Sequence, residues 1–308
     1  MSKYVNIASV AFDQEHLSGH PDAGGLVLVE TGHKLDALRG KGLDLVVLSE
    51  GIEAVAMKMG EAESVDQMGP WLDLYRSFAV SEKCQVVGSI KLVDKAGVHN
   101  SAVFMEPDGT IAGFFHKANL TLGELEMGLT PGGGAVCVDT RIGRLGGVIC
   151  FDLNFEPLRK QYVAMKPDII VFPSMFHGGL MQQMWAYECR SFFVSALPFH
   201  GGGILDPFGR PLALTDCYNT VARARVNLDR VMVHLDYNRD KFDKIERQYG
   251  AEVRIETPAN FGSSLIYSQS EKRTALDIVA EHKLELLDDY FSRATAANAA
   301  KRERGKAG

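Results

Sequence analysis

The chain has 308 residues, of which 46% are hydrophobic and 23% are charged, and its formal net charge is -6. This is the composition of an ordinary globular protein, which excludes a largely disordered chain and a fibrous repeat. The net negative charge does not favour a nucleic-acid partner. No apolar run approaches the roughly 18 residues that span a bilayer, so we expect no membrane partner.

The pattern of hydrophobic residues predicts strands that alternate with helices. Strands are expected at residues 4–12, 43–48, 85–91, 101–105, 110–116, 144–150, 168–172, 192–197, 203–206, 211–214 and 222–227. Helices are expected at residues 26–38, 70–82, 155–165 and 181–190, and a polar, glycine-rich loop at 119–134. Because some strands follow one another as hairpins, this order favours mixed sheets with helices outside them.

The character of the chain changes at about residue 240, and residues 241–308 are expected to form a helical C-terminal extension. Residues 239–249 and 274–293 have the apolar stripe of amphipathic helices. Two alternatives stay open for them, packing against the parent domain and packing across a subunit interface. The basic residues Lys301, Arg302, Arg304 and Lys306 follow an alanine-rich stretch and predict a solvated, frayed tail.

The cysteines and histidines do not form the spacings of a disulfide framework or a metal site. The five cysteines are widely spaced without a CxxC pair, and the nine histidines include no HExxH pair. The N-terminus enters a strand-like segment without a signal-peptide pattern. We therefore expect no metal and a cytoplasmic protein whose cysteines stay reduced. The cysteines are Cys84, Cys137, Cys150, Cys189 and Cys217.

A reactive residue stands at the end of three predicted buried strands. Glu50 follows the strand 43–48, Lys117 follows 110–116, and Cys150 ends 144–150. Each residue alone is more often a solvated charge or an inert core thiol. In layered α/β folds, however, ligands gather beyond the carboxyl ends of strands, so the three side chains could converge on one pocket.

The residues around these positions resemble the three signature segments of the nitrilase superfamily of carbon–nitrogen hydrolases. The segments are Leu-Val-Val-Leu-Ser-Glu ending at Glu50, Phe-Phe-His-Lys-Ala-Asn-Leu around Lys117 and Gly-Gly-Val-Ile-Cys-Phe-Asp around Cys150. Their order and separations match as well. The resemblance covers roughly residues 4–235.

The resemblance implies that residues 1–240 form a carbon–nitrogen hydrolase domain, a four-layer αββα sandwich that is usually paired in a homodimer. It also implies a Glu-Lys-Cys triad that needs no cofactor. Cys150 would be the nucleophile and Glu50 the general base. Lys117 and the backbone N–H of Phe151 would stabilise the oxyanion.

The resemblance also implies a second glutamate in the loop after the lysine. Glu124 and Glu126 both lie near the expected place, and neither aligns without a shift of one residue. We favour Glu124, which follows Gly123, and the alternative for either is a solvent-facing loop charge.

Residues after the nucleophile and in a later loop are expected to bind the substrate. Family members that recognise a carboxylate often have an arginine where this chain has Asn154. By resemblance, the loop after strand 168–172 lines the pocket with Ser174, Met175, Phe176 and His177. An exposed glycine-rich turn is the alternative for His177.

The favoured function is hydrolysis of a small or medium carboxamide to an acid and ammonia through a thioester on Cys150. An N-carbamoyl or ureide hydrolase on the same scaffold is an alternative that Asn154 weakens. A nitrilase is a further alternative, disfavoured because nitrilases resemble Cys-Trp-Glu where this chain has Cys-Phe-Asp. An alternative of another class is a non-catalytic binding or assembly protein.

Overall fold

The computed structural model describes residues 3–12, 20, 22–50, 59–198 and 200–306. The chain divides into two compact units, Val5–Val226 and a second unit made of Asn227–Gly308 with Met1–Tyr4. Each unit is described by itself.

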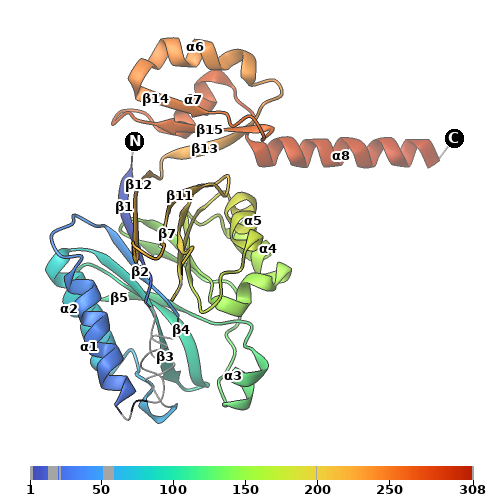
Figure 1. Cartoon of the computed structure of the whole chain (residues 1–308). Coiled ribbons are helices and arrows are strands. Elements are labelled where there is room, and N and C mark those ends of the chain that lie inside the picture. Colours follow the sequence, from blue (N-terminus) through green and yellow to red (C-terminus); the bar gives the residue numbers. More distant parts are fainter. Residues whose placement is uncertain (1–2, 13–19, 21, 51–58, 199, 307–308) are drawn as a thin grey trace. The chain divides into compact units, whose positions relative to one another are not determined.

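Within its described residues, the unit Val5–Val226 contains two mixed sheets (Figure 1). The first has the order β12-β1-β2-β3-β4-β5 and the second the order β11-β10-β9-β8-β7-β6. The first sheet consists of β1 (Tyr4–Val10), β2 (Leu45–Leu48), β3 (Gln85–Asp94), β4 (Gly97–Met105), β5 (Ile111–His116) and β12 (Val221–Asn227). The second consists of β6 (Cys137–Thr140), β7 (Gly143–Gly147), β8 (Ile169–Pro173), β9 (Phe192–Ala196), β10 (Gly203–Leu205) and β11 (Pro211–Leu214).

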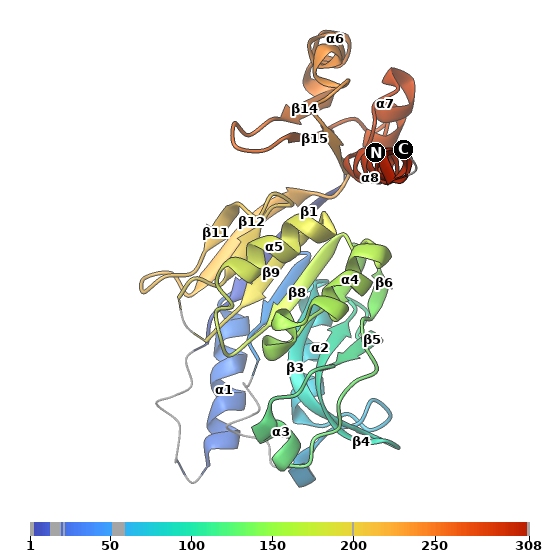
Figure 2. The ribbon, with the colours of Figure 1, turned by 90° about the vertical axis from the view of Figure 1, so that its right-hand side faces the viewer.

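The sheets pack face to face, with helices on their outer sides (Figures 1 and 2). The helices α1 (Ala23–Asp36) and α2 (Pro70–Glu82) cover the first sheet, and α4 (Glu156–Met165) and α5 (Leu180–Cys189) cover the second. A Cβ atom on Gly147 would lie 2.7 Å from the Cβ of Phe115, so this glycine lets the inner faces approach closely. The expected αββα sandwich is confirmed.

The strands that run parallel are buried on both faces, which explains their continuous apolar sequences. β2 pairs in parallel with β1 and β3, and β8 pairs in parallel with β7 and β9. Every residue of β2 and of β8 is buried. Their carboxyl ends deliver the residues that follow them to the same region of the sandwich. The sequence did not predict β6 or the short helix α3 (Leu122–Glu126), which lies inside the expected loop 119–134.

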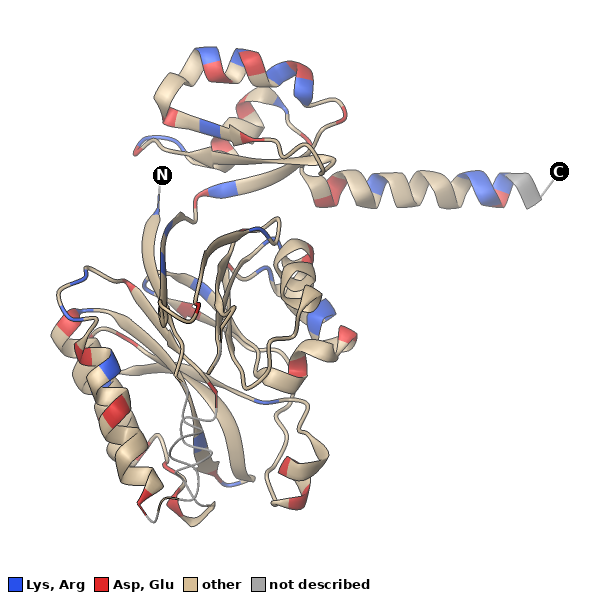
Figure 3. Cartoon of the chain, in the orientation of Figure 1, with Lys and Arg blue, Asp and Glu red and all other residues tan. Residues whose placement is uncertain are grey.

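The second unit has a sheet of its own, with the order β13-β15-β14. Its strands are β13 (Arg230–His234), β14 (Val253–Glu256) and β15 (Ser263–Ser268), and its helices are α6 (Arg239–Tyr249), α7 (Ala275–His282) and α8 (Leu287–Lys306). A small core of Val233, Phe242, Ile245, Val253, Ile266, Ile278 and Leu284 joins the sheet to the helices. Figure 3 shows that α6 carries charges of both signs.

This unit differs from the expected helical extension. It begins at Asn227 instead of residue 241 and contains strands that the sequence did not predict. The expected helix 274–293 is interrupted at Lys283, whose φ of 51° ends α7. The expected frayed tail continues α8 to Lys306, because alanine has the highest intrinsic helix propensity. No helix in the described part of the chain is long and apolar enough to cross a membrane.

Helix α2 begins at a buried carboxylate that is remote in sequence. Glu63 accepts hydrogen bonds from the backbone N–H groups of Gly69, Trp71 and Leu72 at 3.1, 2.8 and 2.9 Å. The backbone of Glu63 also bonds to β3, through its N–H to Lys91 O at 3.0 Å and from Val93 N–H to its own carbonyl at 2.8 Å. Glu63 therefore fixes the start of α2 against the edge of β3.

We predict that Glu63→Ala lowers the free energy of unfolding by about 1–2 kcal/mol, because three N–H groups at a helix start lose their acceptor. Urea denaturation followed by circular dichroism measures the change. Asp66→Ala, at an exposed position of the same loop, is the control and should change little. Equal stability of the two variants would contradict the assignment.

Candidate active site

Glu50 lies at the centre of the site and joins three segments of the chain. It follows β2, is only 4% exposed, and its two oxygens have different partners. Oε1 accepts hydrogen bonds from Lys117 Nζ at 3.0 Å and from Asn100 Nδ2 at 2.9 Å. Oε2 accepts the backbone N–H of Met175 at 2.9 Å. Such contacts fix the carboxylate in one orientation.

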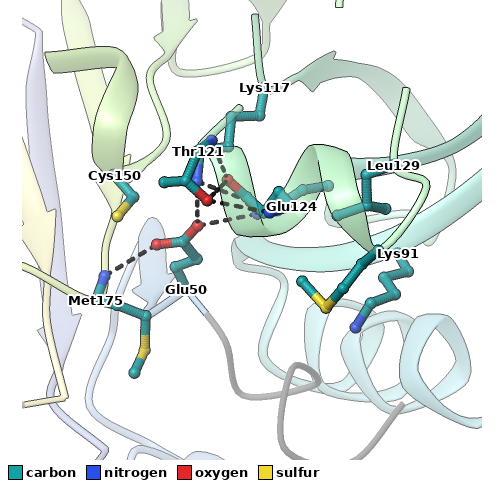
Figure 4. A pocket seen from close by; sticks show the side chains of 10 residues that line it. Glu50, Lys91, Lys117, Thr121, Glu124, Leu129, Cys150 and Met175 are labelled. Carbon is teal, nitrogen blue, oxygen red and sulfur yellow. Dashed lines mark hydrogen bonds and ion pairs between the residues drawn. The ribbon is translucent and has the colours of Figure 1, made fainter. Parts of the chain in front are cut away.

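Lys117 follows β5 and is 2% exposed, with its ammonium group between two carboxylates (Figure 4). Nζ donates to Glu50 Oε1 at 3.0 Å and to Glu124 Oε1 at 2.9 Å. Burial acts to lower the pKa of Lys117, but the charge of Glu50 and the bond to Glu124 outweigh it, and the pKa is raised. Lys117 is therefore an ammonium ion at neutral pH.

Glu124 reaches Lys117 from the short helix α3, whose start it also stabilises. Its Oε2 accepts the backbone N–H of Thr121 at 2.8 Å and the Thr121 hydroxyl at 3.0 Å, in a capping box. Its Oε1 accepts from Lys117 and from Asn100 Nδ2, the latter at 3.1 Å. Burial opposes ionisation, yet these bonds and the charge of Lys117 lower the pKa of Glu124. Glu126, the alternative, is exposed.

Cys150 follows β7 at a sharp turn and is the first residue of a short 3-10 helix, Cys150–Asn154. Its φ of 48° is in the left-handed region, which a non-glycine residue adopts at a cost of about 1–3 kcal/mol. Burial, and next the negative charge of Glu50, raise the pKa of Cys150 to about 12, although Lys117 acts to lower it. The resting side chain is therefore a thiol, and its attack on a substrate requires a base.

Asp152 ties this turn to the segment that follows Lys117. It is fully buried, and its Oδ1 accepts the backbone N–H of Asn119 at 2.7 Å and the side-chain Nδ2 of Asn119 at 2.9 Å. Its Oδ2 accepts the N–H groups of Ala118 at 3.4 Å and Ile149 at 3.3 Å. Burial raises the pKa of Asp152 to about 6, against the effect of these bonds. Asp152 thus fixes the position of Cys150 relative to Lys117.

A pocket of about 250 Å³ opens beside these residues. This is below the roughly 300–1,000 Å³ that drug-sized ligands occupy, so the pocket suits a small molecule. At one end it is bordered by Cys150 and the network around Lys117. Its lining residues are Glu50, Lys91, Asn100, Lys117, Thr121, Glu124, Met127, Leu129, Cys150 and Met175.

Among the predicted substrate-binding residues, Met175 alone belongs to the described lining of this pocket. Ser174 is buried, and its hydroxyl bonds to both backbone groups of Phe176, at 3.0 Å to N–H and at 2.6 Å to O. His177 is exposed and accepts the N–H of Gly179 at 3.0 Å. His177 therefore lies in an exposed turn, which was the alternative interpretation of this residue.

The two other predicted substrate-binding residues point elsewhere. Asn154 is exposed and donates to the backbone oxygen of Phe151 at 3.0 Å. Phe151 is partly exposed, and its ring packs edge-on against Phe155. The predicted role of Phe151 concerned its backbone N–H, which stays a prediction.

Sequence reasoning missed Asn100, Lys91 and Thr121. Asn100 lies on β4, opposite Lys91 on β3, and bridges Glu50 and Glu124. A polar residue inside an apolar strand was the available signal, because buried polar groups need partners. For Thr121 the available signal was the pattern Thr121-x-x-Glu124, which predicts a capping box at the start of a helix.

A group of potential metal ligands lies outside the pocket lining. Among the described residues, ligand atoms of Asp94, His99 and His116 lie within 4.8 Å of one another. The two imidazole rings stack with centroids 3.9 Å apart and planes inclined by 14°. Their nitrogen lone pairs therefore run side by side instead of converging on one ion. His99 bonds to Thr130 O at 2.8 Å and to Asp94 Oδ1 at 3.1 Å, which is a structural role.

Comparison with known protein families identifies the family to which the chain belongs. A family model described as Carbon-nitrogen hydrolase matches residues 14–232. The chain belongs to this family. The resemblance predicted from the three sequence segments is thereby confirmed.

This carbon–nitrogen hydrolase has distant curated relatives. It is 25% identical over 181 residues to hydrolase C26A3.11 of Schizosaccharomyces pombe and 25% identical over 181 residues to omega-amidase NIT2 of Bos taurus. The matches cover 50% and 49% of this chain. They span 56% and 65% of the two relatives, less than two thirds of either.

Solved structures show the same fold. Nit3 of Saccharomyces cerevisiae, a member of branch 10 of the nitrilase superfamily, superposes with a TM-score of 0.64 and 17% identity, covering 84% of this chain and 97% of that one. A mutant of the amidase from Nesterenkonia sp. AN1 gives a TM-score of 0.61 and 13% identity, covering 80% and 96%. In that mutant, the acetamide moiety of fluoroacetamide is attached to the active-site cysteine.

We predict that Asp152→Ala lowers the free energy of unfolding by about 1–3 kcal/mol, because buried N–H groups lose their acceptor. Enzymatic turnover should fall as well, since the turn carrying Cys150 loses its support. Denaturation and a turnover assay on the same preparation measure both effects. Asp139→Ala, at an exposed position on β6, is the control. Parent-like stability and activity of the Asp152 variant would contradict this role.

Proposed function

We propose that this protein hydrolyses the C–N bond of a small carboxamide to a carboxylic acid and ammonia, through a thioester on Cys150. The observation that carries the proposal is the arrangement around Glu50. Its carboxylate is held by Lys117 and by the N–H of Met175 beside a cysteine that stays protonated at rest. A base, a cation and a nucleophile thus border one small pocket.

The first half of the reaction makes the thioester. The Cys150 thiol gives its proton to Glu50 while Sγ attacks the amide carbon. The carbonyl oxygen becomes an oxyanion, which Lys117 and the N–H of Phe151 stabilise. The C–N bond then breaks, and ammonia leaves with the proton that Glu50 held.

The second half restores the enzyme. Glu50 takes a proton from water, and the hydroxide attacks the thioester carbon. The C–S bond breaks, the acid is released, and the sulfur regains the proton from Glu50. Glu124 keeps the Lys117 ammonium in place throughout, because it supplies the second of two carboxylate contacts.

Membership of the family supports amide hydrolysis over a non-catalytic role, as does the likeness to an amidase that reacts at its cysteine. Asn154 does not support the alternative of an N-carbamoyl hydrolase. Its side chain is exposed and donates a hydrogen bond to the backbone oxygen of Phe151 in the same turn. A cytoplasmic location and a homodimer stay predictions from the sequence. The five cysteines all lie among the described residues as free thiols, which agrees with a reducing compartment.

We predict that the protein releases ammonia from short carboxamides and that Cys150→Ala abolishes the release without loss of the fold. A panel of aliphatic amides, aromatic amides, nitriles and N-carbamoyl amino acids, assayed for ammonia, tests the reaction class. Release from the carbamoyl compounds alone would favour the alternative hydrolase. Ammonia release by the Cys150→Ala variant, or none from any compound, would overturn the proposal.

We predict that Glu124→Gln lowers kcat roughly 10- to 100-fold, because one of the two negative charges that balance the buried Lys117 ammonium is replaced by a neutral amide. Glu126→Gln is the matched control two residues away and should keep the parent rate, since Glu126 is exposed. Steady-state kinetics of the two variants on one amide measure the contrast. Equal rates of the Glu124→Gln and Glu126→Gln variants would contradict a role of Glu124 in the reaction.

A further inference from the structure

Asn100 contacts both glutamates of the site without carrying a charge. It lies on β4, is 7% exposed and borders the same pocket as Cys150. Its Nδ2 group donates to Glu50 Oε1 at 2.9 Å and to Glu124 Oε1 at 3.1 Å, so both amide protons are used. Its backbone oxygen accepts the N–H of Lys117 at 2.8 Å. Asn100 is thus bonded to a base, to its companion carboxylate and to the residue that carries the ammonium group.

The amide of Asn100 has one favourable orientation. Its Oδ1 accepts the hydroxyl of Ser89 at 3.0 Å, and Ser89 is fully buried on the neighbouring strand β3. An amide turned by 180° would aim its oxygen at two carboxylates, which accept hydrogen bonds and donate none. The donor side of the amide therefore faces the two glutamates.

These bonds make the two oxygens of Glu50 different. Oε1 accepts two hydrogen bonds, from Lys117 and Asn100, whereas Oε2 accepts the backbone N–H of Met175. In Figure 4, the oxygen bonded to Met175 is the one on the side of Cys150. A lone pair is needed to receive the thiol proton, and both lone pairs of Oε1 are engaged. The geometry therefore favours Oε2 as the atom that receives the proton.

Asn100 also offsets the repulsion between two like charges. The Oε1 atoms of Glu50 and Glu124 bond to the same ammonium group of Lys117, at 3.0 and 2.9 Å. Two carboxylates that share one site favour the uptake of a proton by one of them, and hydrogen bonds to the ionised form act in the opposite direction. Burial acts to raise the pKa of Glu124, and the bond from Asn100 is one of the contacts that nevertheless lower it.

We propose that Asn100 is a positioning residue of the hydrolysis, which keeps both glutamates ionised at the same time and directs the proton of Cys150 to Oε2 of Glu50. The inference rests on the proposed function and goes further, since it assigns a role to a neutral residue that takes no part in bond making or breaking. Ser89 supports this role by fixing the orientation of the amide.

The pH dependence of the reaction depends on every titratable group near Glu50. Those that border the pocket with it, among the described residues, are Lys91 on β3, Lys117 after β5, Glu124 on α3 and Cys150 in the 3-10 helix. Each of them stays in place when Asn100 alone is replaced. A difference in pH profile between the parent protein and an Asn100 variant therefore reports the loss of the amide.

The test is the pH dependence of kcat/KM for one small amide in the parent protein and in Asn100→Leu, which has a similar size and no donors. Losing two N–H groups disfavours the ionised carboxylates, so a higher pH is needed to keep Glu50 as a base. We expect the acidic limb of the profile to move up by about one pH unit, which lowers kcat/KM about tenfold at a given pH on that limb. The loss should become smaller as the pH rises.

A matched control replaces a buried asparagine that is remote in its contacts from the site. Asn227 is 4% exposed and bonds to backbone groups of Lys3, Asp229 and Ser268. Asn227→Leu should lower the temperature of unfolding and leave the acidic limb where it is in the parent protein. The comparison separates the loss of a structural amide from the loss of a positioning one.

A second variant covers the case in which Asn100→Leu does not fold. Ser89→Ala keeps Asn100 and removes the bond that orients its amide. Its acidic limb should move in the same direction by a smaller amount. Thermal unfolding of each variant shows which of them can be compared with the parent protein.

The outcomes for Asn100 and for the proposed function are distinguishable. An unmoved acidic limb in the folded variant, or an equal loss of kcat/KM at every pH, overturns the role of Asn100 while amide hydrolysis stands. An upward shift that Asn227→Leu does not share supports it. If the parent protein releases ammonia from no amide at all, both proposals are overturned.

Discussion

The contact on which the site depends is the pair of carboxylates around the Lys117 ammonium. An ammonium group with an exposure of 2% carries a large desolvation cost, which only close counter-charges offset. Glu50 comes from the end of β2 and Glu124 from α3, so one charge holds together segments far apart in the chain. Removing either carboxylate would leave a buried charge with half of its compensation. The two glutamates therefore support the structure and the chemistry at once.

The same charges control the nucleophile. Burial, and next the negative charge of Glu50, raise the pKa of Cys150, while Lys117 acts in the opposite direction. The thiol consequently stays protonated in the resting site, where a free thiolate would be open to oxidation or alkylation. In the proposed cycle, Glu50 accepts that proton as the sulfur attacks. Its negative charge is thereby neutralised at the moment when the oxyanion forms next to Lys117. The transfer of the proton from Cys150 to Glu50 thus removes one negative charge near Lys117 while the oxyanion forms there as a new one.

The sequence predicted the residues that follow buried strands, but of the residues predicted in the turn after β8 only Met175 lines the described pocket. Glu50, Lys117 and Cys150 were predictable because parallel strands read as continuous apolar runs, and the fold brings their ends together. Ser174, Phe176 and His177 were placed in the pocket by resemblance alone, but side-chain direction in a turn follows from local backbone bonds. The second unit's strands were missed because charged residues interrupt their apolar runs, as in Arg230–His234 and Val253–Glu256.

The left-handed turn at Cys150 shows how the scaffold and the site depend on each other. A φ of 48° is unfavourable for a cysteine and persists only if the surrounding bonds hold it. Asp152, two residues on, supplies such bonds to Ile149 before the turn and to Asn119 beyond Lys117. The position of the sulfur relative to the ammonium is thus set by one buried carboxylate that touches neither. Because a small displacement of reacting groups reduces the rate strongly, this indirect support is as necessary to the proposed reaction as the residues that perform it.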